Sequence, residues 1–593
     1  MIVAIPAIGQ DRPESLLPPG FGDPPPPPPP PSPPPSPPDV QPPVANGTAN
    51  SVSDEPEALL GGSSGTKAAD EKTTSSLDDL DEIDIDALRQ TFDIPAAQRR
   101  SIGQVGVISA GNGGFPIDAF GGGDGRALMS ALKSVRGPLA SRWGSIMTRR
   151  MLSSRTNTPA AINGADWVAE RAWLLLRMGE SVASRQLVQQ VDASNYTDRL
   201  YIVSMQSFLA NADLAGMCPL APTAFGKVND PTWKMARPIC ASLSGEQGAA
   251  TGLLNQARAN RWTVGVDYLL AEKAVGAGVD GRRSVKIEWG KTNGFNAWRF
   301  GLAYATGVNP PAELMKQAGN HVNGWLVQLP MIDVNLRANA APAAAKLGVL
   351  SNNAMVGIYA NALDNPDATP ATKAVAEKLS LAYAGEDETA RVDAMASLWT
   401  AEKANLQAML VLTARAAALV TPSSDQSANS DMLIASMMTA GLDTQATAWA
   451  DVVDSGSLGW GILSAGAPAL SGLVAYDELD DFYDNDQSPN VHKSAMLIAA
   501  LGGLGRVDAA AQKDFIEKIE TDVTVQTVWS RAITAAAERG EAGTVALLVA
   551  AGLQAQDWSQ IPAQHLYYMT RSLRLVGLEA EARMIAAEAI TFA

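Results

Sequence analysis

The sequence predicts an all-α protein, an α-solenoid of stacked helical hairpins that follows a long disordered segment rich in proline. Three observations predict this. The chain is rich in alanine and only 6% of its residues are aromatic, which favours thin, closely packed helices over a β-sandwich. A glycine between two apolar helical runs recurs along the body of the chain. Prolines occupy thirteen of the fifteen positions at 24–38, a composition that cannot build a core.

The first nine residues, MIVAIPAIG, resemble the end of a signal peptide. They are apolar, polar residues follow at once, and the small residues Ala7 and Gly9 stand where a cleavage site requires them. A basic segment and a full apolar core are missing, so either the start of the signal lies upstream or this end has no role. An exported chain is expected in the periplasm, and a cytoplasmic location is the alternative.

Residues 10–155 are predicted to be a disordered leader. Because proline fixes φ and lacks a donor, the proline run should be a polyproline II spacer, about 45 Å long at about 3.1 Å per residue. The rest of the leader is mostly small and polar, and its expected role is to extend reach.

One part of this leader, 77–92, reads LDDLDEIDIDALRQTF. Leu80, Ile83, Leu88 and Phe92 lie near one face of a helix, and six acidic residues fall in its early turns, where negative charge suits the helix dipole. The segment is a candidate docking helix that folds on a partner or on its own body. The alternative is a transient helix in a linker.

The body, 156–593, repeats one local pattern. An apolar helical run is followed by a glycine, then a few small or polar residues and a second run that begins near an alanine. Because glycine ends helices in the left-handed conformation, each unit is predicted to be an αα-hairpin with a tight turn. The seven glycines are Gly179, Gly245, Gly385, Gly441, Gly505, Gly540 and Gly577.

The spacings between these glycines are 66, 140, 56, 64, 35 and 37 residues, mostly near one, two or four times about 35. Such hairpins must stack on one another to bury their apolar faces. The body resembles a divergent tetratricopeptide or Sel1-type α-solenoid, and the whole chain resembles bacterial envelope proteins with helical repeats. The W-x-x-L-G-x-x-Y pattern is absent, so no peptide-binding residue can be transferred. The resemblance implies a scaffold or adaptor.

Cys218 and Cys240 are the two cysteines of the chain. If the chain is exported, a disulfide between them is expected, and two buried free thiols are the alternative. A bridge over this loop would contribute roughly 3 kcal/mol of stability.

The segment around 280–310 interrupts the hairpin pattern and divides the body into what we expect to be two blocks. Trp289, Phe295, Trp298 and Phe300 gather there near Glu288. A glycan could stack on such rings while a carboxylate acts as general acid, as in lytic transglycosylases built on a helical superstructure. This cell-wall enzyme is the alternative function. No second carboxylate is placed to complete a pair, and we expect the rings to pack between the blocks.

Charge and motifs exclude other functions. The net charge of -17 and the lack of a basic cluster argue against nucleic-acid binding. The three histidines, His321, His492 and His565, do not have metal-ligand spacing, and no apolar run reaches bilayer length. We therefore expect a non-enzymatic scaffold or adaptor of the cell envelope with no catalytic residue, cofactor or metal. Its partners would be other envelope proteins, and its oligomeric state stays open.

Overall fold

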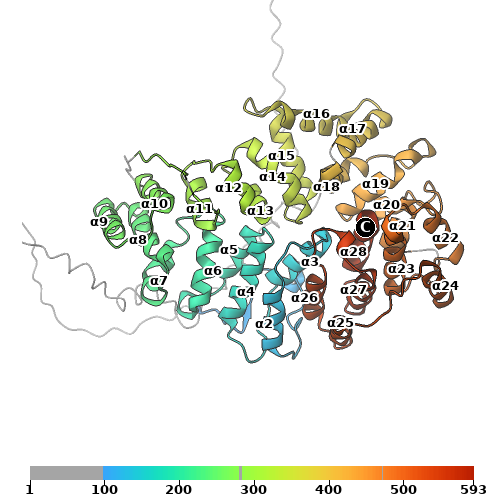
Figure 1. The fold of residues 1–593 in the computed structure, drawn as a ribbon, viewed down its shortest axis with the longest axis horizontal. Coiled ribbons are helices and arrows are strands. Elements are labelled where there is room, and N and C mark those ends of the chain that lie inside the picture. The colour runs from blue at the N-terminus through green and yellow to red at the C-terminus, as the bar shows by residue number, and fades with distance from the viewer. Residues whose placement is uncertain (1–97, 279–283, 291, 402, 470–471) are drawn as a thin grey trace, which may run out of the picture. The chain divides into compact units, whose positions relative to one another are not determined.

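The computed structural model describes residues 98–593, apart from 279–283, 291, 402 and 470–471, and this part of the chain is all-α (Figure 1). The described residues contain helices α2–α28 and one antiparallel pair, β1 (Gln104–Val105) and β2 (Thr156–Asn157), joined by turns and loops. The predicted fold class is confirmed. The signal-peptide remnant, the proline run and the candidate docking helix at 77–92 lie outside the described residues.

The helices of the first half are short, mostly between two and four turns. Their bounds are α2 (Gly125–Ser134), α3 (Arg142–Ser153), α4 (Gly164–Arg177), α5 (Ser181–Val188), α6 (Asp198–Leu209), α7 (Ala221–Lys227), α8 (Pro231–Leu243), α9 (Gln247–Ala259), α10 (Val266–Gly276), α11 (Ala297–Ala305), α12 (Ala312–Gln317), α13 (His321–Val327), α14 (Val334–Lys346) and α15 (Asn352–Leu363).

The second half continues in the same way. Its helices are α16 (Pro370–Ala384), α17 (Glu388–Ala401), α18 (Leu406–Ala417), α19 (Ser427–Thr439), α20 (Asp443–Thr447), α21 (Leu458–Gly466), α22 (Tyr476–Asn485), α23 (His492–Leu504), α24 (Ala509–Ile519), α25 (Val528–Glu538), α26 (Ala542–Gly552), α27 (Ala563–Leu575) and α28 (Glu579–Phe592). Short 3-10 turns join some of them: η3 (Ala110–Asn112), η4 (Ala193–Asn195), η5 (Cys218–Leu220), η6 (Lys403–Asn405), η7 (Ser424–Gln426), η8 (Pro489–Val491) and η9 (Trp558–Gln560).

Many of these helices begin at a residue whose side chain accepts a hydrogen bond from the first turn. This oxygen satisfies one of the backbone N–H groups that a helix start leaves without a partner. The capping residues are Asp124, Ser141, Asn163, Thr197, Asp230, Asn296, Asp333, Ser351, Thr369, Ser457, Asp508 and Thr527.

Six of the seven predicted glycine turns share one geometry. Gly179, Gly245, Gly441, Gly505, Gly540 and Gly577 have φ between 68° and 87°, and each ends the first helix of a pair. The residue after each glycine donates its backbone N–H to the carbonyl five residues earlier, at 2.8–3.1 Å, which is the hydrogen bond of a Schellman motif.

Gly385 differs, and the left-handed turn predicted there is wrong. Its φ is -58° and ψ 151°, so the chain leaves α16 in an extended conformation before α17. A Cβ at Gly385 would lie 2.9 Å from the Leu381 carbonyl oxygen and 3.0 Å from the Arg391 side chain. Glycine is used at this position because the space is small.

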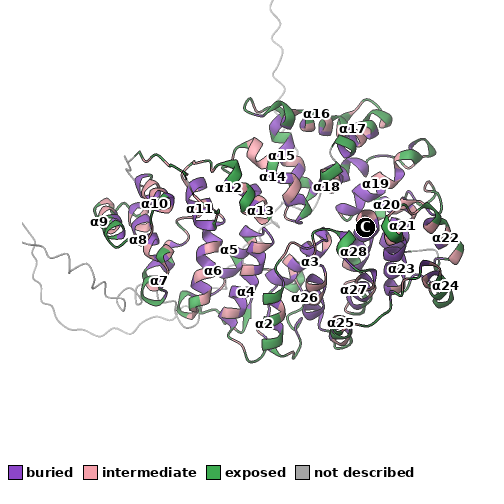
Figure 2. Ribbon diagram, in the orientation of Figure 1, coloured by how far each residue is buried: buried purple, intermediate pink, exposed green. Residues whose placement is uncertain are grey.

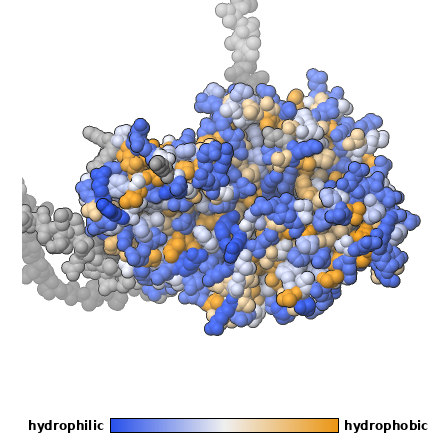
Figure 3. Space-filling model, in the orientation of Figure 1, coloured by the Kyte–Doolittle hydropathy of each residue, from blue (hydrophilic) through white to orange (hydrophobic). Residues whose placement is uncertain are grey.

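Helices adjacent in the chain pack on one another, as in α4 with α5, α8 with α9, α18 with α19 and α27 with α28. Figure 2 shows the consequence, since buried residues follow the sides on which neighbouring helices meet and exposed residues cover the outer sides. Residues on both sides of the segment at 280–310 belong to one compact unit, Glu82–Ala593. The visible surface mixes hydrophilic residues with small apolar patches (Figure 3).

The prediction that the disordered leader extends to residue 155 is wrong for residues 98–155. They contain β1, α2 and α3, and Phe115 and Phe120 are buried. This segment has too few apolar residues to form a core by itself. Its apolar side chains pack instead into a core formed by helices that lie far along the sequence. The Phe120 ring meets Trp167 of α4 edge to face at 5.2 Å, and α2 also packs on α26.

Glycines in this segment allow close backbone contacts. A Cβ at Gly106 would lie 2.2 Å from the Ser154 carbonyl oxygen, and one at Gly125 would lie 2.1 Å from that of Ala160. The fully buried Arg171 of α4 adds hydrogen bonds to the Val105, Leu152 and Ser154 carbonyls. The glycine-rich composition therefore reflects tight packing here.

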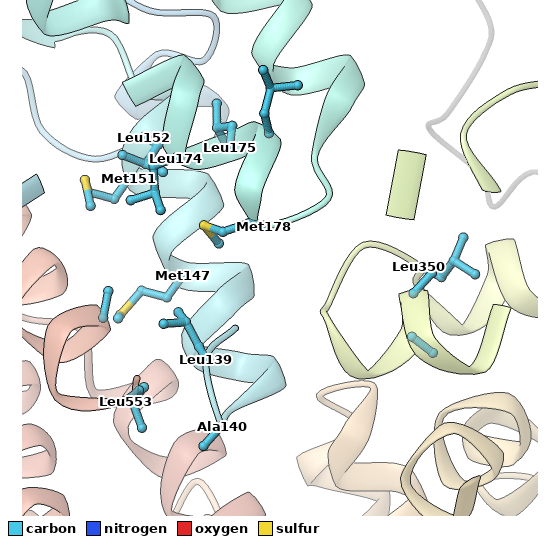
Figure 4. Packing of buried hydrophobic residues seen from close by; sticks show 14 of the residues in the cluster. Leu139, Ala140, Met147, Met151, Leu152, Leu174, Leu175, Met178, Leu350 and Leu553 are labelled. Carbon is cyan, nitrogen blue, oxygen red and sulfur yellow. The ribbon is translucent and has the colours of Figure 1, made fainter. Parts of the chain in front are cut away.

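Helix α3 joins the beginning of the described chain to its end. It packs on α4 and on the C-terminal helices α26 and α28. In Figure 4, Met147, Met151 and Leu152 of α3 lie between the ribbon of α4, which carries Leu174 and Leu175, and the C-terminal helices near Leu553. The Leu553 carbonyl also accepts a hydrogen bond from the Ala140 backbone N–H at 2.8 Å.

The buried carboxylate of Glu588 in α28 caps the start of α3. It accepts hydrogen bonds from Ser141 Oγ at 2.5 Å, from Arg142 N at 2.7 Å and from Trp143 N at 3.1 Å, and Gln407 Nε2 donates to it at 2.8 Å. The Arg142 guanidinium donates to the Ala345 carbonyl at the end of α14. One acid and one arginine thus connect α3, α14, α18 and α28.

Candidate binding groove

A groove of about 730 Å³ runs along one side of α4. Helix α4 and its N-cap Asn163 form the floor, because residues at positions 166, 170, 173 and 177 are three or four apart and share one face of the helix. Helices α2 and α6, which both pack on α4, supply the walls. The lining residues are Met129, Lys133, Ile162, Asn163, Asp166, Glu170, Trp173, Arg177 and Arg199.

The two carboxylates of the groove are held by partners. Glu170, whose side chain is 6% exposed, accepts from Arg199 Nε at 2.8 Å and from Arg199 Nη2 at 3.3 Å. Lys133 Nζ lies 3.8 Å from the same carboxylate. Asp166 accepts the hydroxyl of Thr197 at 2.6 Å. These acids position the basic side chains around them.

Arg177 lies at the end of the floor, and no carboxylate among the described residues forms an ion pair with it. Its guanidinium is 6.0 Å from the centroid of the Trp173 ring, over which Arg199 also lies, at 5.5 Å. Its Nε is buried and has no hydrogen-bond partner among the described residues. Burial holds the pKa of Arg177 below its usual value, and repulsion from Arg199 and Arg136 adds to this, against the attraction of Glu170.

The groove therefore carries more positive than negative charge, in a chain whose net charge is -17. Lys133, Arg177 and Arg199 face two carboxylates, and Arg136 follows α2 on the same side as Arg177. Trp173, Met129 and Ile162 add apolar surface. This combination suits carboxylates attached to an apolar scaffold, such as an acidic peptide, because arginine pairs with carboxylates and aromatic rings pack on apolar side chains.

The groove was not predicted from the sequence, for two reasons. Lys133 fell in the span predicted to be disordered, and the floor residues fell in the apolar run before Gly179. A signal was present, since Asp166, Glu170, Trp173 and Arg177 interrupt an apolar helix at regular spacing. Polar residues on a single stripe of such a helix indicate a side that is not fully covered.

Cys218 and Cys240 form the predicted disulfide, with their Cα atoms 5.4 Å apart. The bridge connects η5 to α8, and Cys240 lies five residues before the Gly245 turn. The disulfide prediction is confirmed. A disulfide is compatible with an oxidising compartment.

Glu288 and the aromatic residues near it do not form an enclosed site. The Glu288 side chain is 72% exposed, with Lys286 Nζ at 3.9 Å. The rings contact one another, Trp289 tilted against Phe295, Phe295 edge to face with Phe300, and Phe300 edge to face with Trp325 of α13. They pack α11 against neighbouring elements, while the carboxylate points to solvent.

The three histidines lie in different parts of the fold. The His321 ring meets Trp325 edge to face and the His565 ring lies tilted against Trp529, whereas His492 Nε2 lies 3.3 Å from the Trp558 carbonyl oxygen. In the described part of the chain, no group of three or more His, Cys, Asp or Glu side chains is placed to hold a metal ion. None of the described helices has both the length and the apolar character needed to cross a bilayer.

Comparisons with protein-family models, with curated proteins and with solved structures find no match for this chain.

Proposed function

We propose that this chain is a non-enzymatic scaffold or adaptor of the bacterial cell envelope and that the groove on α4 is a contact site for partner proteins. The observation that carries the proposal is the excess of positive charge in this groove within a strongly acidic chain. A cationic groove with apolar walls selects an acidic segment of a partner, and its charge also speeds the encounter.

The helical pairs support this role. Six glycine turns of one geometry follow one another along the body, and helices adjacent in the chain pack together. In our proposal these hairpins stack as in an α-solenoid, a fold whose long surfaces are used to bind proteins. The disulfide and the signal-like N-terminus support a periplasmic location.

A photo-crosslinking amino acid at Met129, which lines the groove, tests the proposal in intact cells. We expect it to capture a partner protein, and mass spectrometry would identify a segment rich in Asp and Glu at the crosslink. The matched control carries the same amino acid at Val528, which is 76% exposed and lies on α25. Equal capture at both positions, or none at Met129, would contradict the proposal.

The alternative of a cell-wall enzyme makes a separate prediction. If Glu288 were a general acid, Glu288→Gln would abolish the release of muropeptides, the wall fragments that such an enzyme produces. In our account the variant releases them at the rate of the unchanged protein. A strong loss with the fold intact would replace the scaffold proposal by the enzyme.

A further inference from the structure

The described chain begins beside the groove. Arg100 donates from its backbone N–H and its Nε to Asp192, at 2.7 and 2.8 Å, in the connection between α5 and α6. The same connection supplies Thr197 to Asp166, and α6 supplies Arg199 to Glu170. The described chain therefore begins, at residues 98–100, next to the groove.

Two residues after Arg100, Ile102 contacts a residue shortly before α4 and the first residue of α4. Its carbonyl accepts the hydroxyl of Thr158 at 2.7 Å, and a Cβ at Gly164, the first residue of α4, would meet the same carbonyl at 2.0 Å. Ile162 and Asn163, directly before α4, line the groove. The chain is thus held at the end of the groove where α4 begins.

The segment upstream has the chemistry that the groove selects. Residues 82–92 read EIDIDALRQTF and carry three carboxylates, one arginine and the apolar side chains Ile83, Leu88 and Phe92. As a helix, the segment would place Glu82 and Asp86 one turn apart beside Ile83. Its carboxylates match Lys133, Arg136 and Arg177, and its apolar side chains match Met129, Ile162 and Trp173.

The lengths are compatible with docking. The ten Cα–Cα steps from Phe92 to Ile102 span at most about 35 Å when extended. The floor from Asn163 to Arg177 is about 21 Å long, and an eleven-residue helix measures about 16 Å. A segment on so short a tether also has a high effective concentration at the groove, so weak contacts suffice to hold it there.

We infer that residues 82–92 of this chain bind in its own groove on α4 and compete there with the acidic segment of a partner. The inference rests on the proposed function only in taking the groove as the partner site. The segment would act as an intramolecular competitive inhibitor, which a partner displaces when its acidic segment binds the groove more tightly.

Zero-length crosslinking with a carbodiimide tests this on the purified full chain without any partner. The reagent joins a lysine amine to a carboxylate only when the two are in contact. We expect a product that joins Lys133 to Glu82, Asp84 or Asp86, identified by mass spectrometry. Products that join Lys133 to Glu170, 3.8 Å away, and Lys518 to Asp484, 4.0 Å away, are internal controls for the chemistry.

A variant of the segment distinguishes specific binding in the groove from crosslinking caused only by the short tether. Ile83→Ser, Leu88→Ser and Phe92→Ser together keep every carboxylate of the segment and leave the folded body unchanged, but they remove its apolar face. We expect the yield of the Lys133 product to fall about fivefold or more, and Arg136→Glu to lower it in the same direction. An unchanged yield in the triple variant would overturn the inference.

Mixing the chain with a copy labelled with ¹⁵N decides whether the contact lies within one molecule. Products with one isotope only support the inference, while mixed products would assign the segment to a second copy and overturn it. If both control products form but no product joins Lys133 to residues 82–92, the inference is wrong and the proposed function is unaffected. If the product forms but the photo-crosslinker at Met129 captures no partner, only the proposed function fails.

Discussion

Glu588 shows how much one buried residue contributes to the connection between the two ends of the described chain. Its carboxylate accepts hydrogen bonds from three groups at the start of α3 and from Gln407. Burial raises the pKa of Glu588, and the hydrogen bonds from Ser141, Trp143 and Arg142 and the charge of Arg142 oppose that rise. The Arg142 guanidinium also feels the charge of Glu180, but the Ser141 hydroxyl and the backbone N–H groups of Arg142 and Trp143 donate to Glu588.

Glu588→Ala should therefore destabilise the protein strongly. The variant leaves buried N–H and O–H donors without an acceptor and removes the stronger of the two negative charges that act on the buried Arg142, and such losses cost about 3–5 kcal/mol. Urea denaturation measures the change in the free energy of unfolding. The control is Glu579→Ala in the same helix, whose side chain is 52% exposed, and we expect a change below about 1 kcal/mol. Similar losses in both variants would contradict this role of Glu588.

His321 and His565 make stability depend on pH. Burial against tryptophan lowers the pKa of both histidines, so they are neutral in the folded protein. Below about pH 6.5 the unfolded chain binds protons that these folded histidines do not. Their contribution to stability is therefore complete above about pH 6.5 and is lost as the pH falls below it.

We expect the free energy of unfolding to decrease between pH 7.5 and pH 5.5, and the double variant His321→Phe, His565→Phe to show a smaller decrease. Urea denaturation at the two pH values measures this. Because other groups also titrate, the comparison between the two proteins is the decisive quantity. An identical decrease in both would show that the histidines are not responsible.

At the scale of the element, the glycine turn is the recurring feature, and the α8–α9 hairpin allows a matched test. Gly245 has φ 82° and Gly248 lies within α9, and a Cβ at either would meet no atom within 4 Å. Gly245→Ala should cost about 1–2 kcal/mol because only the backbone conformation is strained.

Gly248→Ala should stabilise the protein by up to about 1 kcal/mol, because alanine favours the helix. Thermal or urea unfolding compares the two variants directly. The account of the turns fails if Gly245→Ala is neutral or if both variants change stability in the same direction.

The sequence could predict six of these turns, and the structure shows why others escaped. Gly307 and Gly348 have φ 68° and 79°, and the residue after each donates to the carbonyl five residues earlier, as in the predicted turns. Both are followed by valine, which the pattern did not include. They lie inside the long interval between Gly245 and Gly385, which was predicted as a multiple of the repeat.

Two further turns have the same hydrogen bond without glycine, at Ala212 and Arg261, whose φ values are both 50°. Local sequence could not have indicated them, because the left-handed conformation there is imposed by the packing of the helices on either side. The sequence pattern therefore predicted turns in which a glycine adopts the left-handed conformation. It missed turns in which tertiary packing imposes that conformation on another residue.

The disulfide acts on one element of the fold. Cys218→Ala with Cys240→Ala should lower the free energy of unfolding by roughly 3 kcal/mol, as expected for closure of a loop of this length. Denaturation of the oxidised protein, with and without a reductant, gives the same comparison without mutation. A change below about 1 kcal/mol would show that the helices around the bridge hold this region without it.

At the scale of the whole molecule, contacts between distant parts of the chain decided what sequence reasoning could not. The segment at 98–155 has the composition of a linker, but its Phe115 and Phe120 enter a core that α4 and α26 complete. Buried arginines provide a second example. Arg506 and Arg583 donate to carbonyls at the end of α21, so they satisfy groups that a helix end leaves unpaired.

The groove belongs to this scale as well, because α2, α4 and α6 each supply part of it. The spacing of polar residues along α4 was readable in the sequence, but Lys133 and Arg199 reach Glu170 only through the packing of three helices. The charge of the groove is the property on which the proposed function depends, and it can be changed at Lys133 and Arg136, whose side chains are exposed.

Lys133→Glu with Arg136→Glu tests this claim most directly. Both side chains are exposed, and Glu170 keeps Arg199 at 2.8 Å as its partner when Lys133 is changed. The fold should therefore remain, and the positive charge of the groove is reversed. In intact cells, chemical crosslinking followed by purification should recover the partner with the unchanged chain and with the control Lys316→Glu, which is 72% exposed on α12. Our account predicts that the groove variant loses the partner, and recovery in equal amounts from all three proteins would contradict it.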